Sequence, residues 1–313
     1  MREAGALDVV TVGEAMALLI AQQPGRLEDV GSFARATAGA ELNVAVGLAR
    51  LGHRVAYLSR LGADSFGRHL RAFMDAEGID THHVAVDTAH PTGFMLKSLV
   101  SDGSDPAIEY YRKGSAASHL APGDYPAATC AAARHVHLTG ISPGVSASLR
   151  ELVFLMARQA RAAGRTVSFD PNLRPRLWAS EAEMRDTLNA LASESDWVLP
   201  GLGEGRLLTG ADSAEGIADF YLQRGATVVV VKLGPAGAFY AHRDGRRGTV
   251  AGVPVARVVD TVGAGDGFAV GLISGLLEDL PLPEAVARAN RIGARVVGFP
   301  GDCDGLPTRA ELG

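Results

Sequence analysis

The sequence has few cysteines, few aromatic residues and no long hydrophobic run. Only Cys130 and Cys303 occur among 313 residues, which argues against a disulfide framework and favours a reducing compartment. No stretch of roughly 18 consecutive apolar residues occurs, and no signal segment opens the chain, so we expect a cytoplasmic protein without a membrane partner. The formal net charge of −5 supplies no basic surface, which argues against a nucleic-acid partner.

Apolar strands alternate with helical patterns along most of the chain. Hydrophobic residues make up 47% of the sequence, enough for one large core or two smaller ones. The expected strands are 7–12, 54–59, 134–138, 166–169, 197–199, 227–232 and 248–255. The expected helices are 42–49, 64–77, 146–163, 181–193, 214–224, 267–277 and 282–297. This alternation predicts an α/β fold with a mainly parallel central sheet flanked by helices and joined by right-handed crossovers.

Residues 90–111 interrupt the alternation. Two β-rich runs, 93–100 and 107–111, flank a polar turn at Asp102-Gly103-Ser104, a pattern typical of a hairpin. We expect these strands to project from the main body as a small β lid, together with an apolar run at 15–21; the lid strands then fall at about 15–37 and 91–113. Without a repeat, charge block or linker, the sequence favours a single domain over residues 1–313.

A glycine-rich stretch near the C-terminus follows one expected strand and leads into an apolar helix. A loop of small residues at a helix start leaves several N–H groups unpaired and pointing the same way, which makes an anion site. Bulky side chains at Gly263, Ala264 and Gly265 would block close approach to it. Asp266 then places a carboxylate in the first helical turn, where amide groups favour its charged form and make it a candidate proton acceptor. The alternative is a glycine-rich turn with an ordinary helix-start aspartate.

This stretch resembles the C-terminal signature of a known family. Residues 260–266, Asp-Thr-Val-Gly-Ala-Gly-Asp, resemble the motif of the ribokinase-like (PfkB) sugar kinases. The resemblance implies a ribokinase-like fold with ATP and Mg²⁺ as cofactors, Asp266 as the catalytic base, and Gly263, Ala264 and Gly265 around the transferring phosphoryl group. It places Thr261 on the nucleotide side, together with Gly263 and Gly265. Lid strands in this family often pair between protomers, so a homodimer or higher homo-oligomer is also implied.

Two further segments resemble the sugar-binding parts of the family. Gly39-Ala40-Glu41-Leu42-Asn43 resembles the N-terminal signature, with Ala38 where the first of two glycines often lies; it implies that Gly39 and Asn43 contact substrate. A first-turn helix residue is the alternative role of Asn43. Residues 170–174, Asp-Pro-Asn-Leu-Arg, follow a strand end, where ligands bind in open α/β sheets. They match the family's central motif and imply that Asn172 and Arg174 contact substrate.

The expected lid ends in a segment that narrows the substrate class. Residues 110–116, Tyr-Tyr-Arg-Lys-Gly-Ser-Ala, resemble the family branch acting on 2-keto-3-deoxygluconate, which implies substrate contacts by Tyr111 and Arg112. Arg112 and Arg174 come from separate elements, and two arginines favour an acid sugar because a buried carboxylate must be compensated. The alternatives are an edge strand ending in solvated charges, and an Arg174 that caps its strand or pairs with Asp170.

The remaining candidates concern nucleotide and metal. Lys232, Gly234 and Gly237 form the pattern Lys-x-Gly-x-x-Gly, which resembles the nucleotide-side segment, and Asn290 resembles an adenine-flanking asparagine. A solvated lysine and a helix-packing asparagine are the alternatives. Glu204 resembles the family's magnesium-linked glutamate, which implies that it contacts the metal through water. A carboxylate suits this role because Mg²⁺ prefers oxygen ligands and retains waters. Gly201 departs from the asparagine common in that motif, and a first-turn carboxylate is the alternative role of Glu204.

Together these residues predict an ATP-dependent kinase that phosphorylates a primary hydroxyl of an acid sugar. The favoured reaction converts 2-keto-3-deoxygluconate to its 6-phosphate. A neutral sugar such as fructose, or the galacto epimer, remains an alternative on the same fold. A catalytically silent nucleotide-binding regulator is a different class, and it would have no need of Asp266. A dinucleotide oxidoreductase would require Gly-x-Gly-x-x-Gly after the first strand, which residues 13–16 do not supply.

Overall fold

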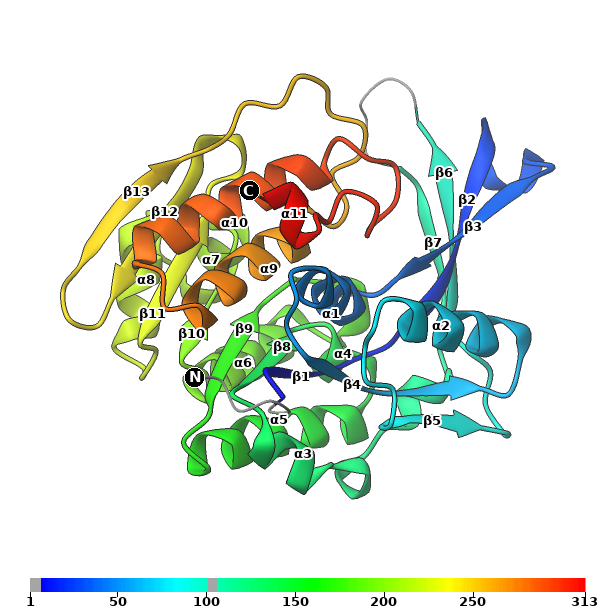
Figure 1. Cartoon of the computed structure of the whole chain (residues 1–313), viewed down its shortest axis with the longest axis horizontal. Helices are drawn as coiled ribbons and strands as arrows, with labels where there is room; N and C mark the ends of the chain where they lie inside the picture. Colours follow the sequence, from blue (N-terminus) through cyan, green and yellow to red (C-terminus); the bar gives the residue numbers. More distant parts are fainter. Residues whose placement is uncertain (1–6, 101–105, 313) are drawn as a thin grey trace.

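The central feature of the computed structural model, which describes residues 7–100 and 106–312, is a nine-stranded sheet (Figure 1). Its strands, in spatial order, are β13 (Arg247–Ala251), β12 (Gly237–His242), β11 (Val228–Lys232), β10 (Trp197–Val198), β9 (Thr166–Asp170), β8 (His135–Thr139), β1 (Val9–Val12), β4 (Val55–Gly62) and β5 (Val84–Asp87). The strands from β11 to β5 run parallel, while β12 and β13 are antiparallel additions at one edge. The predicted α/β fold with a mainly parallel sheet is therefore confirmed.

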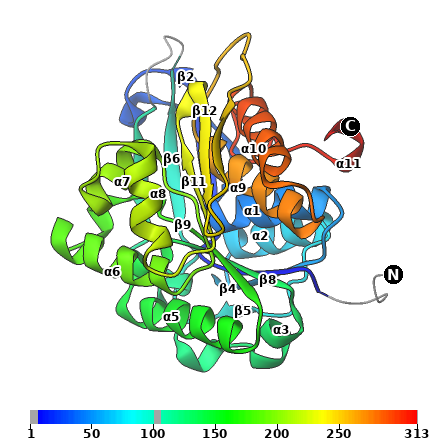
Figure 2. The same ribbon diagram turned by 90° about the vertical axis from the view of Figure 1, so that its left-hand side faces the viewer.

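Helices cover both faces of this sheet (Figure 2). They are α1 (Ala40–Arg50), α2 (Ser65–Ala76), α3 (Ala127–Ala132), α4 (Ser142–Val145), α5 (Ala147–Ala162), α6 (Glu181–Ser193), α7 (Leu202–Thr209), α8 (Ala214–Leu222), α9 (Ala264–Leu277), α10 (Leu282–Val296) and α11 (Arg309–Leu312). Alternate strand residues point to opposite faces, so Val228 and Val230 join the core with α1, α9 and α10, whereas Val229 and Val231 join the core with α5, α6 and α8. The continuous valine run of β11 is thus buried on both faces.

The edge of the sheet next to the glycine-rich stretch differs from the prediction. The strand expected at 248–255 ends at Ala251, because the Gly252 amide donates to the Ala236 carbonyl outside the ladder and Pro254 supplies no N–H for further pairing. Strand β12 was not predicted. It reverses direction directly after β11, so the strand-helix alternation is broken there.

A second sheet of four strands stands apart from the main one (Figure 1). Its order is β3 (Phe33–Ala38), β2 (Met16–Pro24), β6 (Phe94–Leu99) and β7 (Ile108–Tyr111), and we call it the small sheet. One face carries its own apolar cluster of Met16, Leu18, Ala38 and Met95. The hairpin turn predicted at Asp102-Gly103-Ser104 lies outside the described residues.

Helix α9 packs unusually close to α10. A Cβ atom added at Gly271 would lie only 2.5 Å from the Cα of Ala289, so no larger residue fits without moving the backbone of α10. From Asp266 to Gly275 every residue of α9 is buried. We call this glycine contact the α9–α10 seam, and it fixes the helix that begins with the glycine-rich motif.

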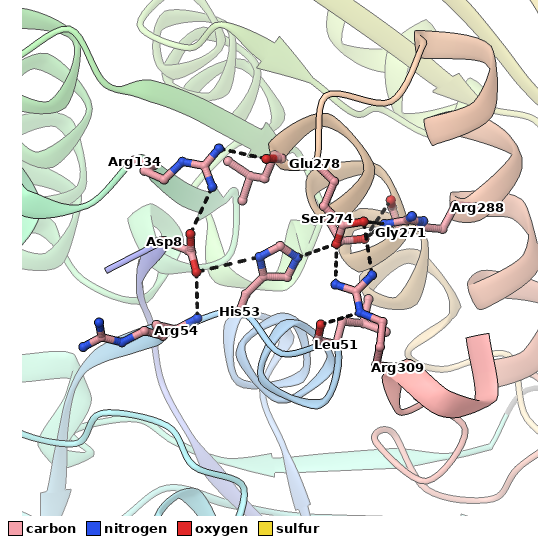
Figure 3. Close-up of polar contacts among 11 residues, drawn as sticks. Asp8, Leu51, His53, Arg54, Arg134, Gly271, Ser274, Glu278, Arg288 and Arg309 are labelled. Carbon is pink, nitrogen blue, oxygen red and sulfur yellow. Dashed lines mark hydrogen bonds and ion pairs between the residues drawn. The ribbon is translucent and has the colours of Figure 1, made fainter. Parts of the chain in front are cut away.

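The C-terminal end of α9 carries an ionic cluster, drawn in Figure 3, which we call the Glu278 cluster. Glu278 accepts hydrogen bonds from Arg288 at 2.8 Å and from Arg309 at 3.1 Å, and its carboxylate lies 3.2 Å from Nε2 of His53. Burial alone would raise the pKa of Glu278, but the bonds from Arg309 and Arg288 outweigh it and lower the pKa to about 2. Arg134 joins the cluster through its bond to the Leu277 carbonyl oxygen.

Within residues 7–100 and 106–312, no helix combines the length and apolar character needed to cross a membrane.

Candidate active site

Two cavities meet at the carboxyl ends of the central strands, where ligands bind in open α/β sheets. The first has a volume of about 250 Å³ and lies between the small sheet, α1 and the start of α9. The second, of about 470 Å³, lies between α9, α10 and the turn after β11. Lys232, Thr261 and Gly265 line both, so a ligand in one cavity adjoins a ligand in the other.

The glycine-rich motif forms the first turn of α9. The helix begins at Ala264, three residues before the predicted start at 267, and Gly263 caps it with φ of +82°. A Cβ atom at Gly263 would lie 2.7 Å from the carbonyl oxygen of Asp302, so both backbone conformation and space require glycine. The Ala264 amide donates weakly, at 3.4 Å, to the Thr261 carbonyl, and the Gly265 amide belongs to the first turn, whose donors have no intrahelical partner. The start of α9 therefore faces both cavities, and helix starts with such amide donors favour anions.

Asp266 is buried at the junction, with 8% of its surface exposed. Its Oδ2 accepts a hydrogen bond of 2.7 Å from Asn43 of α1, and its Oδ1 accepts one of 3.3 Å from Asn172, which follows β9. Cys303 donates to Oδ1 of Asn43 at 3.0 Å, which orients that amide so that its nitrogen faces Asp266. Two asparagines from distant segments thus hold one carboxylate.

Burial raises the pKa of Asp266 to about 7, and the nearby Asp170 and Asp302 add to the effect. The Asn43 bond and the Arg174 charge oppose this rise without cancelling it. The expectation that helix-start amides keep this carboxylate charged is therefore wrong, because burial outweighs them. The outcome suits a general base, whose ideal pKa lies near the working pH.

Lys232 and Asp170 form a buried ion pair where the two cavities join. Their Nζ and Oδ2 atoms lie 2.7 Å apart, at the ends of strands β11 and β9, which flank β10 in the sheet. Burial would lower the pKa of Lys232, but the negative charges of Asp170 and Glu204 raise it, so the ammonium group stays charged. The predicted alternative in which Arg174 pairs with Asp170 is wrong, since Lys232 occupies that carboxylate and Arg174 donates to the Leu173 carbonyl instead.

The end of β7 corrects one predicted contact. Tyr110 lines the first cavity, whereas Tyr111 does not: it is 49% exposed, stacks on Phe94 at 4.6 Å and donates to Glu109. The reason is strand geometry, since successive side chains point to opposite faces of the small sheet. Arg112 lines the cavity as predicted, and its guanidinium also binds the buried carboxylate of Glu14 at 2.6 and 2.7 Å.

Glu204 lines the first cavity with both carboxylate oxygens already engaged. Oε2 accepts from the Gly201 amide at 2.6 Å, closing the first turn of α7, and Oε1 accepts from the Leu173 amide at 2.9 Å. Glu204 therefore has the structural role in the first helical turn that was named as its alternative. The bond to Leu173 also ties α7 to the loop carrying Asn172 and Arg174, both of which line the cavity.

Most residues assigned to nucleotide gather around the second cavity, whereas Gly263 lines the first. Gly234, Gly237 and Asn290 line it together with Thr261 and Gly265. Asn290 also donates to the carbonyl oxygens of Val250 and Ala251 at 3.2 and 3.0 Å, so it holds the end of β13 as well. The other walls are mainly apolar and come from residues 252–258, α9 and α10. Such walls suit a flat aromatic ring.

Several residues of the first cavity were not singled out from the sequence. Gly39, Asn43, Asn172, Arg174 and Asp266 converge there as expected. The additional residues are Met16, Met95, Tyr110, Ile141, Asp170 and Asp302. Asp170 opens the motif that named Asn172, so its neighbourhood was a usable signal. Asp302 had none, because it reaches the cavity from a loop near the C-terminus.

Comparison with known proteins identifies the family. A family model described as pfkB family carbohydrate kinase matches residues 6–309. The chain belongs to the pfkB family of carbohydrate kinases. The kinase is thus a phosphotransferase, and the family predicted from residues 260–266 is confirmed.

Individual relatives resemble this pfkB kinase over nearly its whole length. It is 49% identical to the 2-dehydro-3-deoxygluconokinase of Bacillus subtilis, over 98% of this chain and 94% of that protein. The crystal structure of a PfkB protein from Polaromonas sp. JS666 has 55% identity and a TM-score of 0.91, covering 98% of this chain and 99% of that one. A putative ribokinase II from E. coli, solved with ATP and Mg²⁺, has 26% identity and a TM-score of 0.89, covering 98% and 97%.

Proposed function

We propose that this kinase transfers the γ-phosphoryl group of ATP to the primary hydroxyl of 2-keto-3-deoxygluconate, giving the 6-phosphate. The observation that carries the proposal is the junction of two cavities at Lys232, Thr261 and Gly265, with Asp266 buried beside it. The likeness to a 2-dehydro-3-deoxygluconokinase supports the choice of sugar, and the E. coli structure with ATP and Mg²⁺ supports the choice of donor.

The two cavities differ in the way that two different substrates require. The first, at about 250 Å³, is lined by charged and amide side chains, which suit a small polyhydroxylated acid. The second is larger and mostly apolar, which suits a nucleobase. ATP in the second cavity would extend its phosphates past Lys232 toward the start of α9, where backbone amides favour negative charge.

In this arrangement Asp266 accepts the proton of the attacking hydroxyl. The bonds from Asn43 and Asn172 aim its oxygens into the first cavity, and the raised pKa lets it hold the proton at neutral pH. The amides of Gly263, Ala264 and Gly265 stabilise charge growing on the transferred group. Phosphoryl transfer passes through a loose transition state, so alignment and electrostatics supply most of the rate.

The residues present fit a magnesium ion bound mainly through phosphate and water. Within the two described ranges, no group of three or more His, Cys, Asp or Glu side chains is arranged to hold a metal by itself. Asp170 and Glu204 line the first cavity with carboxylates, and Mg²⁺ commonly uses one or two such groups while keeping several waters. Bound there, Mg²⁺ would neutralise phosphate charge, with Glu204 contacting it through water.

Recognition of an acid sugar is assigned to the two arginines of the first cavity. Arg112 already shares its charge with Glu14, so Arg174 is the cation on which carboxylate binding chiefly depends. A neutral sugar would gain nothing from Arg174, which is why the acid is preferred over fructose.

A panel of sugars with ATP and Mg²⁺ tests this proposal directly. We expect turnover on 2-keto-3-deoxygluconate and little on fructose, and the galacto epimer belongs in the same panel. Arg174→Ala should raise KM for the acid sugar about 10- to 100-fold, the range for losing a hydrogen bond to a charged group. The exposed Arg176→Ala is the matched control, two residues away. An unchanged KM in Arg174→Ala, or faster turnover on fructose, contradicts the acid-sugar assignment.

We also propose that the small sheet acts as a lid over the first cavity, within a single kinase domain, and pairs with the small sheet of a second protomer. Met16 and Met95 of this sheet already line the cavity, while Leu99 and Tyr111 are 38% and 49% exposed and available to a partner. Light scattering that gives a monomer at micromolar concentration would contradict the pairing.

Both cysteines are free thiols, which supports a cytoplasmic location, to be checked by cell fractionation.

A further inference from the structure

Lys97 is a buried lysine on β6 of the small sheet. Only 3% of its side chain is exposed. Met95, two residues earlier on the same strand face, lines the first cavity. Lysine is rarely buried to this extent without a partner, so its surroundings need an explanation.

Two carboxylates from distant segments surround the Lys97 ammonium group. It forms an ion pair with Oδ2 of Asp260 and lies 3.5 Å from Oδ1 of Asp302. The side chains of Asp260 and Asp302 are 8% and 5% exposed. Two buried carboxylates are costly unless a cation compensates them, and Lys97 supplies that charge.

Both aspartates shape the anion-binding turn before α9. Oδ1 of Asp260 accepts from the Val262 amide at 3.0 Å, which bends the chain two residues before Gly263. The carbonyl oxygen of Asp302 packs against Gly263, at the position where a Cβ atom would clash. The same ammonium group therefore joins the small sheet to the two segments that form the turn.

We propose that Lys97 is a positioning residue for phosphoryl transfer: it docks the small sheet against the turn at 260–263 and neutralises two carboxylates that would otherwise repel phosphate. This inference rests on the proposed kinase function and adds a residue that does not line either cavity. Lys97 acts through Asp260 and Asp302, not by touching a substrate.

The loss of Lys97 has a consequence for Asp266. The groups facing Asp266 are Asn43 of α1, Asp170, Asn172 and Arg174 at or after β9, Asp302 of the C-terminal loop, and Lys232 of β11. Asp302 raises the pKa of Asp266 through its negative charge, and Lys97 partly offsets that charge. Removing the ammonium group should therefore move the acid limb of the rate–pH profile to higher pH.

The test compares Lys97→Met with Lys113→Met, which removes an exposed lysine from the loop after β7. We expect Lys97→Met to lower kcat by up to about 10²-fold, because a mutation far from the reacting atoms can still misplace them. We also expect weaker ATP binding in calorimetry and an acid limb shifted to higher pH. Lys113→Met should match the wild type. The double variant Lys97→Met/Asp302→Asn removes one of the stranded carboxylates and should recover part of the loss.

The outcomes separate this inference from the proposed function. No wild-type turnover on any sugar contradicts the proposed function, and ATP affinity then still reports the effect of Lys97. Wild-type kcat, pH profile and ATP affinity in Lys97→Met overturn the inference. A loss in kcat that leaves the acid limb unmoved and is not relieved by Asp302→Asn indicates a purely structural role and also overturns it. Circular dichroism and thermal melts of each variant confirm that the compared proteins are folded.

Discussion

Helix α9 carries one carboxylate in its first turn and another at its C-terminal cap, and the two are held in opposite ways. Asp266 is buried, bonded by two neutral asparagine amides, and has a pKa raised to about 7 by that burial. Glu278 is bonded by Arg288 and Arg309 and has a pKa lowered to about 2. One group is poised to exchange a proton at neutral pH, whereas the other stays charged.

The helix dipole predicts the reverse order. A carboxylate is favoured at a helix N-terminus and disfavoured at a C-terminus, by about 0.3–1 kcal/mol near the surface. Because the two pKa values fall the other way, burial and side-chain partners dominate the dipole at both ends. The contrast shows that one helix holds a carboxylate with a raised pKa at one end and an ion-paired carboxylate with a lowered pKa at the other.

The largest expected effect comes from removing the Asp266 carboxylate at the N-terminal end of α9. Asp266→Asn should lower kcat by about 10² to 10⁴-fold, the range for loss of a general base, while ATP binding persists. Steady-state kinetics and calorimetry check both points. Turnover close to that of the wild type would remove Asp266 from the role of base.

Removing the charge of Glu278, at the C-terminal end of α9, should lower stability and leave kcat unchanged. Glu278→Gln should lower the free energy of unfolding by about 1.5–3 kcal/mol, because hydrogen bonds to two charged groups, one of them part-buried, are lost. Asp279→Asn is the matched control: it removes a neighbouring exposed charge, and asparagine tolerates the positive φ of 59° at that position. Urea unfolding and kcat should be measured on both; a fall in kcat for Glu278→Gln would show that the two ends are not independent.

The pH dependence of the reaction sharpens the comparison further. Asp266 must be unprotonated to act as a base, so kcat/KM should rise with pH and level off above about pH 7. Below that value it should fall by about tenfold per pH unit. An acid limb near pH 4, the ordinary range of an aspartate, would contradict the assigned environment.

The smallest effect is expected at acid pH in the Glu278 cluster. The pKa of Glu278 is lower in the folded than in the unfolded protein, so its contribution to stability is full above about 4.5 and is lost as pH falls toward 2. The difference in unfolding free energy between wild type and Glu278→Gln should therefore be constant near neutrality and shrink in acid. A constant difference down to pH 3 would contradict this account.

Local chemistry predicted much of the fold and site. The valine run of β11 and the small residues at 263–265 depend on neighbours in sequence, so the strand, the turn and the following helix could be predicted there. Strand geometry decided against Tyr111 in favour of Tyr110, and only the register of the small sheet reveals which of two adjacent tyrosines faces the cavity.

The remaining features depend on contacts between distant segments. The pKa of Asp266 follows from burial, which the first-turn position does not express. Lys97 lies 163 residues from Asp260 and 205 from Asp302, and no local pattern marks a lysine on a strand as buried. The Glu278 cluster likewise joins residues from both ends of the chain.

The α9–α10 seam restricts movement on one side of the first cavity, the side formed by α9. With backbone against backbone at Gly271 and Ala289, α9 has no slack for tilting or sliding when substrates enter. Adjustment to differently shaped sugars must then come from the small sheet on the other side of the first cavity. Sequence changes that alter substrate selectivity should therefore accumulate in the small sheet rather than along α9.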